Sequence, residues 1–266
     1  MAQLDGIRGL LLDLNGVFYV GNRLLPGALQ LVEFLQAAGI PYRFATNNTT
    51  ESLGTLSQAL GRMGLAIAPE EIISAPYSAA LHLRKQGYGR ITPLLTQDVR
   101  QDFAEFQFSE TDAEAVVVGD MAEEWSYRLL NQAFKQVRQG AELVALHRGK
   151  AWQWEGGLRL DVGAFVAGLE YATDTAATVV GKPATSFFEL ALADLGLPPY
   201  QVAVVGDSLT ADISGAQQAG LMGILIQTGQ YRSTDVASSS ITPDLELESL
   251  TMLQRHLQQM LSAISS

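Results

Sequence analysis

Polar side chains with complementary chemistry follow four separate apolar runs of this 266-residue sequence. Each lies directly after its run or one glycine further on. The positions are Asp13, Thr46-Asn47, Lys182 and Asp207. We interpret the apolar runs as buried parallel strands, whose carboxyl ends share one edge of an open sheet where ligands bind. A single acid at a strand end fits a helix cap equally well, whereas four such positions together predict one site.

The acids among these positions predict a Mg²⁺ site. After a strand that is buried on both faces, a carboxylate needs a partner, because an unpaired buried charge is costly. Asp13 and Asp207 could supply oxygen ligands to Mg²⁺, and Asp13 could also act as a nucleophile. Asp212 follows five residues after Asp207. We expect Asp212 to cap the next helix or to support the metal ligands rather than to bind the metal itself.

The other two positions indicate phosphate binding. Thr46 and Asn47 offer a hydroxyl, a carboxamide and backbone donors at the approach to a helix, which is how a phosphate oxygen is commonly held. A polar turn that caps the helix would have the same residues. Lys182, between Gly181 and Pro183, could bind phosphate as a compact point charge, and an ordinary surface lysine is its alternative interpretation.

Composition narrows the class of protein. Lys and Arg number 17 against 28 Asp and Glu, so the formal net charge is −11, and such a surface repels nucleic acid and anionic membranes. The absence of cysteine excludes disulfides, thiolate zinc sites and cysteine nucleophiles. No apolar run approaches the roughly 18 residues of a membrane span, and the first residues do not resemble a signal peptide. We therefore expect a soluble cytoplasmic protein without nucleic-acid or membrane partners.

The elements that must position these residues alternate along the chain. Short apolar runs and amphipathic stretches follow one another, which predicts α/β architecture with a mostly parallel sheet. The predicted strands are residues 7–12, 41–45, 72–73, 91–95, 115–118, 143–146, 178–180, 202–205 and 223–226. The predicted helices are residues 26–39, 51–63, 78–86, 125–138, 161–170, 186–195, 213–219 and 249–262, and residues 238–240 are predicted to be loop.

Taken in order, these motifs resemble the signature of the haloacid dehalogenase superfamily of phosphohydrolases. The motifs are Asp13-x-Asn15-Gly16-Val17, Thr46-Asn47, Lys182-Pro183 and Gly206-Asp207-x4-Asp212. The resemblance implies a Rossmann-like core of residues 1–76 and 180–266. It also implies an inserted α/β cap of the class IIA (C2) type at residues 77–179, which would exclude water and select the substrate. A homodimer formed through the cap is a further implication.

The resemblance also implies a role for each residue around the nucleophile. Asp13 would attack the substrate and form an aspartyl-phosphate. The side chain of Asp13, the backbone carbonyl of Asn15 and Asp207 would hold Mg²⁺. Most phosphatases of the superfamily have Asp two residues after the nucleophile, where it protonates the leaving oxygen, and this chain has Asn15. An amide cannot perform this general acid–base role, which is typically worth roughly 10²–10⁴-fold in rate.

For the phosphate side of the site, Thr46 would bind the transferring phosphoryl group, Asn47 would line that loop and Lys182 would neutralise charge. The substrate would be a small phosphorylated compound. Because Asn15 cannot donate a proton, we expect good substrates to have leaving groups that need little protonation, such as phosphoramidates, pyrophosphate and aryl phosphates. Two alternatives stay open: a catalytically weak protein that binds Mg²⁺ and phosphate, or a phospho-acceptor domain whose phosphorylated Asp13 is recognised by a partner.

Overall fold

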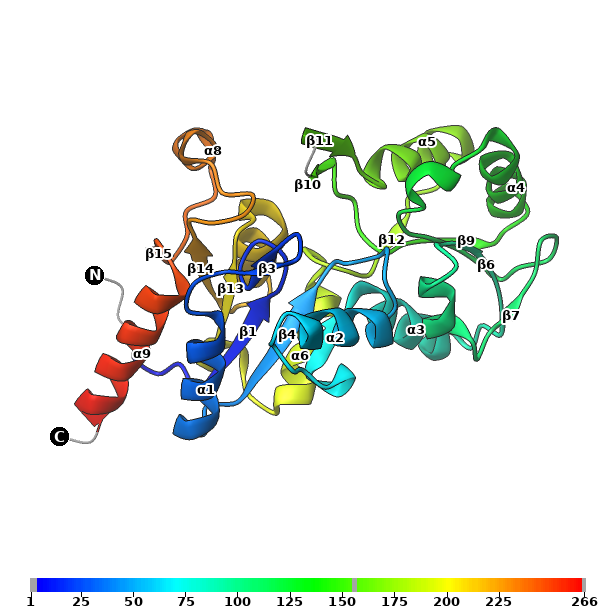
Figure 1. The fold of residues 1–266 in the computed structure, drawn as a ribbon. Coiled ribbons are helices and arrows are strands. Elements are labelled where there is room, and N and C mark those ends of the chain that lie inside the picture. The colour runs from blue at the N-terminus through cyan, green and yellow to red at the C-terminus, as the bar shows by residue number, and fades with distance from the viewer. Residues whose placement is uncertain (1–3, 155–156, 265–266) are drawn as a thin grey trace. The chain divides into compact units, whose positions relative to one another are not determined.

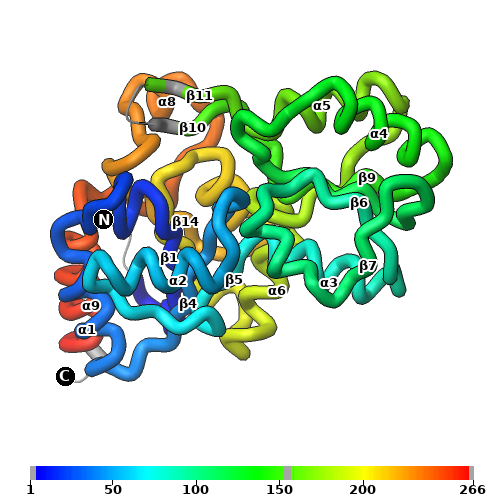
Figure 2. The backbone as a smooth tube through the Cα atoms, turned by 45° about the vertical axis from the view of Figure 1, so that its right-hand side comes forward, coloured from blue at the N-terminus to red at the C-terminus, as the bar shows by residue number. Residues whose placement is uncertain are grey.

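The computed structural model describes residues 4–154 and 157–264 (Figure 1). In this part of the chain, strands and helices alternate and form two compact units. The first unit comprises Met1–Thr46, Ala59–Ile73 and Thr185–Ser266, and the second comprises Asn47–Gln58 and Ser74–Ala184. Figure 2 traces this division along the chain, because blue and red segments belong to the first unit and most of the green segments to the second.

The compact units differ from the predicted domains in three stretches. Residues 47–58, 74–76 and 180–184 belong to the second unit, whereas the sequence analysis placed them in the core. The compact units reflect which residues pack together, whereas the predicted cap is a segment inserted into the core sequence, so the two boundaries need not coincide. The predicted limits of core and cap at residues 76/77 and 179/180 therefore stay a prediction.

The sheet of the first unit has the strand order that creates a binding crevice. Within the described residues it is six-stranded, in the order β15-β14-β13-β1-β4-β5. Strand β1 pairs in parallel with β13 and β4, and β14 pairs in parallel with β13 and β15. Strands β4 and β5 lie on one side of β1, and β13, β14 and β15 lie on the other. The strand order therefore reverses between β1 and β13, which is where open α/β sheets bind ligands. The strands are β1 (Gly9–Asp13), β4 (Tyr42–Thr46), β5 (Ile72–Ser74), β13 (Val202–Gly206), β14 (Met222–Ile226) and β15 (Leu245–Leu247).

A second sheet forms the core of the other unit. Its described strands lie in the order β12-β9-β8-β6-β7, and all of these neighbours pair in parallel. Alternate residues of β8 face opposite sides: Val117 packs in one apolar cluster with Leu83 of α3, and Val116 in another with Val166 of α5. The strands are β6 (Arg90–Leu94), β7 (Gln107–Phe108), β8 (Ala115–Val118), β9 (Glu142–Ala145) and β12 (Thr178–Val179).

Helices follow the strands in both units, as the sequence predicts for parallel α/β architecture, and that fold class is confirmed. They are α1 (Ala28–Ala38), α2 (Leu53–Arg62), α3 (Ala75–Gln86), α4 (Tyr127–Arg138), α5 (Gly163–Thr173), α6 (Thr185–Leu195), α7 (Gly215–Gln218), α8 (Ser233–Ser238) and α9 (Leu250–Ile264). In the predicted helix 213–219, α7 is preceded by a π-helical turn over Leu209–Ser214. Helix α8 includes Ser238, which the sequence analysis had placed in a loop.

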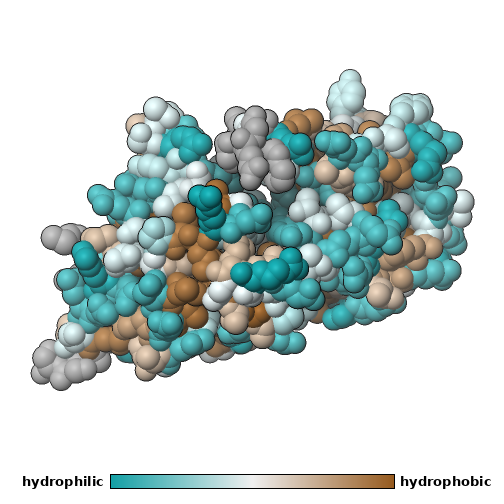
Figure 3. Space-filling view, viewed as in Figure 1, coloured by the Kyte–Doolittle hydropathy of each residue, from teal (hydrophilic) through white to brown (hydrophobic). Residues whose placement is uncertain are grey.

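Two small hairpins complete the described structure. One pairs β2 (Tyr19–Val20) with β3 (Arg23–Leu24), and the other pairs β10 (Ala151–Trp154) with β11 (Gly157–Leu160). On the face drawn in Figure 3, apolar residues of the first unit gather over α1 and the β2–β3 hairpin. None of the described helices has both the length and the apolar character that a membrane crossing requires.

Candidate active site

The central strand β1 carries Asp13 to the edge of the first sheet. All five residues of this strand are buried, and Asp13 is its last residue. Its register partner on β4 is Ala45, so Thr46 lies one residue further along the neighbouring strand. On the other side of β1, Asp207 follows the end of β13 and is only 3% exposed. Thr46 and Asp207 therefore lie at the ends of the two strands that flank β1, at the switch point of the sheet.

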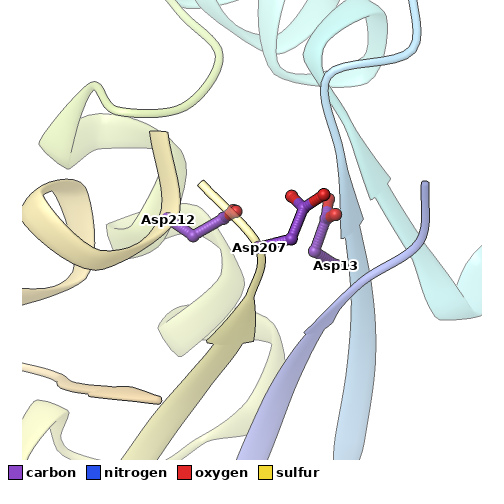
Figure 4. A group of neighbouring side chains, drawn as sticks. All are labelled: Asp13, Asp207 and Asp212. Carbon is purple, nitrogen blue, oxygen red and sulfur yellow. The ribbon is translucent and has the colours of Figure 1, made fainter. Parts of the chain in front are cut away.

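Three carboxylates meet at this edge (Figure 4). Asp13, Asp207 and Asp212 each offer an oxygen atom within 4.8 Å of the others, and all three residues are buried. The carboxylates of Asp13 and Asp207 point toward one another, and Asp212 approaches from the turn after β13. Like charges in a buried volume repel, and a divalent cation would balance them. The donor set is entirely oxygen, which suits a hard ion such as Mg²⁺.

Asp212 also holds the turn that carries Asp207. Its Oδ2 accepts a hydrogen bond from the backbone N–H of Ser208 at 3.1 Å. A Cβ atom on Gly206 would overlap the carboxylate of Asp212, so only glycine allows this acid to lie against the end of the strand. Asp212 thus reaches the acidic cluster and orders the chain between the two acids, and its part in metal binding stays a prediction.

A loop that the sequence analysis did not single out contacts both Asp207 and the segment that follows Asp13. Residues 228–230 follow β14, and the backbone N–H of Gln230 donates to Oδ2 of Asp207 at 2.7 Å. The hydroxyl of Thr228 donates to the backbone carbonyl of Gly16 at 2.6 Å. The sequence offers only a weak signal for this loop, a polar Gln-Thr-Gly stretch after an apolar run.

Lys182 and Asn47 lie together in the second unit. The carboxamide of Asn47 contacts the backbone of Lys182 twice: its Oδ1 accepts from the Lys182 N–H at 2.9 Å, and its Nδ2 donates to the Lys182 carbonyl at 2.8 Å. Lys182 is 3% exposed. The interpretation as an ordinary surface lysine is therefore wrong, and Asn47 has a positioning role in addition to the phosphate-loop role that the resemblance implies.

The same unit buries a histidine beside two acids. The Nδ1 of His147 accepts a hydrogen bond from the Gly149 N–H at 3.1 Å and lies 3.8 Å from Oδ2 of Asp161. Burial lowers the pKa of His147, although the charges of Asp161 and Asp120 partly oppose that shift. A neutral ring with its proton on Nε2, directed at the hydroxyl of Thr49 3.5 Å away, satisfies these contacts.

Known proteins match both ends of the chain. A family model described as "Haloacid dehalogenase-like hydrolase" matches residues 10–109, and one described as "HAD-hyrolase-like" matches residues 179–253. The human "Haloacid dehalogenase-like hydrolase domain-containing protein 2" is 37% identical over 261 residues, which cover 97% of this chain and 99% of that protein. This chain belongs to the haloacid dehalogenase-like hydrolases. The resemblance deduced from its four motifs is confirmed.

Other haloacid dehalogenase-like relatives point to the kind of hydrolase. The "Phospholysine phosphohistidine inorganic pyrophosphate phosphatase" of Xenopus laevis is 36% identical over 250 residues, covering 91% of this chain and 92% of that protein. The structure of a 4-nitrophenylphosphatase from Thermotoga maritima superposes with a TM-score of 0.89 at 28% identity, covering 95% and 98% of the two chains. A p-nitrophenyl phosphatase from Archaeoglobus fulgidus gives 0.87 at 25% identity, covering 94% and 98%. Family and relatives together make this chain a phosphatase.

Proposed function

We propose that this phosphatase is Mg²⁺-dependent and acts through an aspartyl-phosphate on Asp13. The observation that carries the proposal is the group of three buried carboxylates at the switch point of the sheet. A divalent cation would balance their charge, and Asp13 ends the central strand, where a substrate in the crevice could reach it. Mg²⁺ bound there would neutralise charge on the phosphoryl oxygens. We propose Asp13, Asp207 and the backbone carbonyl of Asn15 as its protein ligands.

In the proposed reaction a carboxylate oxygen of Asp13 attacks phosphorus while the bond to the leaving group breaks. The leaving group departs with its electron pair and, where it needs a proton, takes it from solvent. Water then attacks the phosphorus of the aspartyl-phosphate and gives up a proton to solvent, while the bond from phosphorus to the Asp13 oxygen breaks. Inorganic phosphate is released and the carboxylate is restored. Thr46 would hold the phosphoryl group and Lys182, fixed by Asn47, would balance its charge. Such transfer depends mainly on positioning and charge stabilisation.

The residue at position 15 directs us to the substrate class. The side chain of Asn15 is exposed and, as an amide, cannot donate a proton to the leaving group. We propose that preferred substrates are small compounds whose leaving groups need little protonation: phosphoramidates, pyrophosphate and aryl phosphates. The names of the relatives, which include phospholysine, phosphohistidine, pyrophosphate and 4-nitrophenyl phosphate, agree with this class.

The setting of the reaction belongs to the same proposal. Residues 77–179 would act as the cap that chooses the substrate, and residues 1–76 and 180–266 as the catalytic core. We propose a cytoplasmic enzyme that works without nucleic acid or membrane partners and forms a homodimer. The formal charge of −11 supports the proposed lack of nucleic-acid and membrane partners, because such a surface disfavours polyanions.

A chromogenic assay tests the nucleophile. Purified protein is incubated with 4-nitrophenyl phosphate with and without Mg²⁺, beside Asp13→Asn and the control Asp235→Asn, which makes the same change at an exposed position of α8. We expect nitrophenol release that requires Mg²⁺, survives in Asp235→Asn and is lost in Asp13→Asn. Turnover by Asp13→Asn would show that Asp13 is not the nucleophile. No turnover by the folded wild type would contradict the proposal and favour the phosphate-binding or phospho-acceptor alternatives.

A further inference from the structure

The loop after β14 encloses one oxygen atom of Asp207. The backbone N–H of Gln230 donates to Oδ2 of that carboxylate at 2.7 Å. Two glycines form the walls around the same atom, since a Cβ on either Gly16 or Gly229 would overlap Oδ2. Both glycines have positive φ, 91° and 56°, a region that side chains rarely allow. The carboxylate of Asp207 therefore has one oxygen fixed in a notch of backbone, which sets the direction of the other.

The notch exists only while two distant loops stay in contact. A Cβ on Gly229 would lie 2.5 Å from the Cα of Gly16, so the two backbones touch directly. The hydroxyl of Thr228 joins them by donating to the carbonyl of Gly16 at 2.6 Å. The nucleophile loop is itself closed by a hydrogen bond from the Gly16 N–H to the carbonyl of Tyr19 at 2.8 Å. Thr228 thus ties the loop after Asp13 to the loop that holds Asp207.

We propose that residues 228–230 are a positioning loop that sets Asp207 and the nucleophile loop at the separation that a divalent cation requires. Partners behind metal ligands fix the orientation of the ligands, and their loss commonly costs 10–100-fold in metal affinity. A backbone N–H is a rigid donor, because it cannot change rotamer as a side chain would. This inference rests on the proposed function, because it assigns a role toward the Mg²⁺ that Asp13 and Asp207 would share.

The hydroxyl of Thr228 is the part that can be removed with least disturbance. Thr228→Val keeps the shape of the half-buried side chain and deletes the donor to Gly16, while Thr228→Ser keeps the donor. Thr234→Val makes the same chemical change at an exposed position of α8. Gly229→Ala is the stronger perturbation, because its methyl group would occupy the space of Asp207 Oδ2 and of Gly16 Cα.

The measurement is the dissociation constant for Mg²⁺ alone, obtained by isothermal titration without substrate, together with the unfolding temperature of the metal-free protein. We expect Thr228→Val to weaken Mg²⁺ binding about tenfold and Gly229→Ala about 100-fold. Thr228→Ser and Thr234→Val should bind like the wild type. In turnover assays, Thr228→Val should need about tenfold more Mg²⁺ for half-saturation. Its kcat at saturating Mg²⁺ should stay close to that of the wild type.

Three results would overturn the inference. If Thr228→Val binds Mg²⁺ like the wild type, the loop does not position the ligands. If Thr228→Val lowers the unfolding temperature and kcat without changing Mg²⁺ affinity, the loop has only a structural role. If Thr228→Ser is as weak as Thr228→Val, the hydroxyl is not the cause. Absence of Mg²⁺ binding in the wild type would instead remove the proposed function and this inference together, so the two failures are distinguishable.

Discussion

The two compact units use buried carboxylates in opposite ways. Both contain a Gly-Asp pair at the end of a buried strand. Gly206 is the last residue of β13 and Asp207 follows it, and Gly119-Asp120 comes directly after β8. At the first edge, Asp207 shares a small volume with two other acids. At the second, Oδ1 of Asp120 accepts from the Ala122 N–H at 2.9 Å, and the charge of Asp120 acts on the buried His147.

Other acids of the second unit also hold backbone. A short 3-10 helix, Val99–Phe103, follows β6 and is preceded by Asp98. Asp98 and Asp102 accept hydrogen bonds from the N–H groups of Ser52 and Leu53 at 2.7 and 3.1 Å. These donors lie at the start of α2, where helices leave N–H groups unsatisfied. In the second unit these acids hold backbone N–H groups singly, whereas in the first unit three buried acids also converge on one small volume. A strand-end acid indicates an ion site when further acids converge on it.

The test with the largest expected effect on turnover replaces Asp by Asn in each of the two Gly-Asp pairs. Asp207→Asn should reduce Mg²⁺-dependent turnover by about 10³-fold, since a bound metal supplies several kcal/mol and each 1.4 kcal/mol is tenfold. It should also raise the unfolding temperature of the metal-free protein, because it removes one of three neighbouring buried charges. Asp120→Asn should leave turnover close to wild type. Equal losses in the two variants, measured by phosphate release, would show that the edges do not differ.

A second test adds an acid at the first edge. Asn15→Asp restores a group that can protonate the leaving oxygen, and we expect kcat/KM for an alkyl phosphate to rise about 10²-fold. Turnover of 4-nitrophenyl phosphate should rise much less, because nitrophenolate departs readily without a proton. Asn131→Asp, the same change on α4, serves as the control. An equal gain for both substrates, or none in a folded variant, would contradict the role assigned to position 15.

The smallest expected effect concerns an acid that supports α2. Burial raises the pKa of Asp102 to about 6, more than its hydrogen bond from Leu53 lowers it, and the charge of Asp98 raises it further. The folded protein therefore binds this proton more tightly than the unfolded chain, so its contribution to stability grows as pH falls from about 6 toward 4. Above pH 6 the ionised carboxylate should cost about 1 kcal/mol, after allowance for its partial exposure.

Urea unfolding of the wild type and Asp102→Asn between pH 4 and 8 measures this effect. The variant should be more stable than the wild type by about 1 kcal/mol at pH 7.5, and the two should converge near pH 4. If the unfolding free energies of the two proteins changed in parallel over the whole pH range, Asp102 would titrate like an exposed acid. Asp112→Asn, at an exposed position of the same unit, controls for the loss of one negative charge.

The sequence predicted the acids of the site because each follows a buried strand that can be recognised from its apolar run. Asp13 and Asp207 were identified in this way, and the parallel α/β fold that brings them together is confirmed. The loop at Thr228 was missed because its contacts join residues far apart in the chain, and one of them is made by a backbone N–H that no side-chain pattern records. The hairpin β2–β3 was missed because strands of two residues have no periodicity.

Asn47 shows another limit of sequence reasoning. Its amide has both a donor and an acceptor, so phosphate binding and backbone binding are chemically equivalent interpretations of the residue type. The structure shows it paired with both polar groups of the Lys182 backbone. Only the fold reveals that partner, because the two residues come from widely separated segments of the chain.

The contact between Gly16 and Gly229 also restricts which substitutions these two positions can accept. At most tightly packed positions, a larger side chain can be accommodated when its neighbour becomes smaller. Here both partners already lack a side chain, and the third wall is the carboxylate of Asp207. No second substitution at either glycine can create the missing space, since no residue is smaller than glycine, and shortening Asp207 would remove a proposed metal ligand. In a library of random variants, these two sites should therefore lack suppressor pairs, although they lie at opposite ends of the sequence.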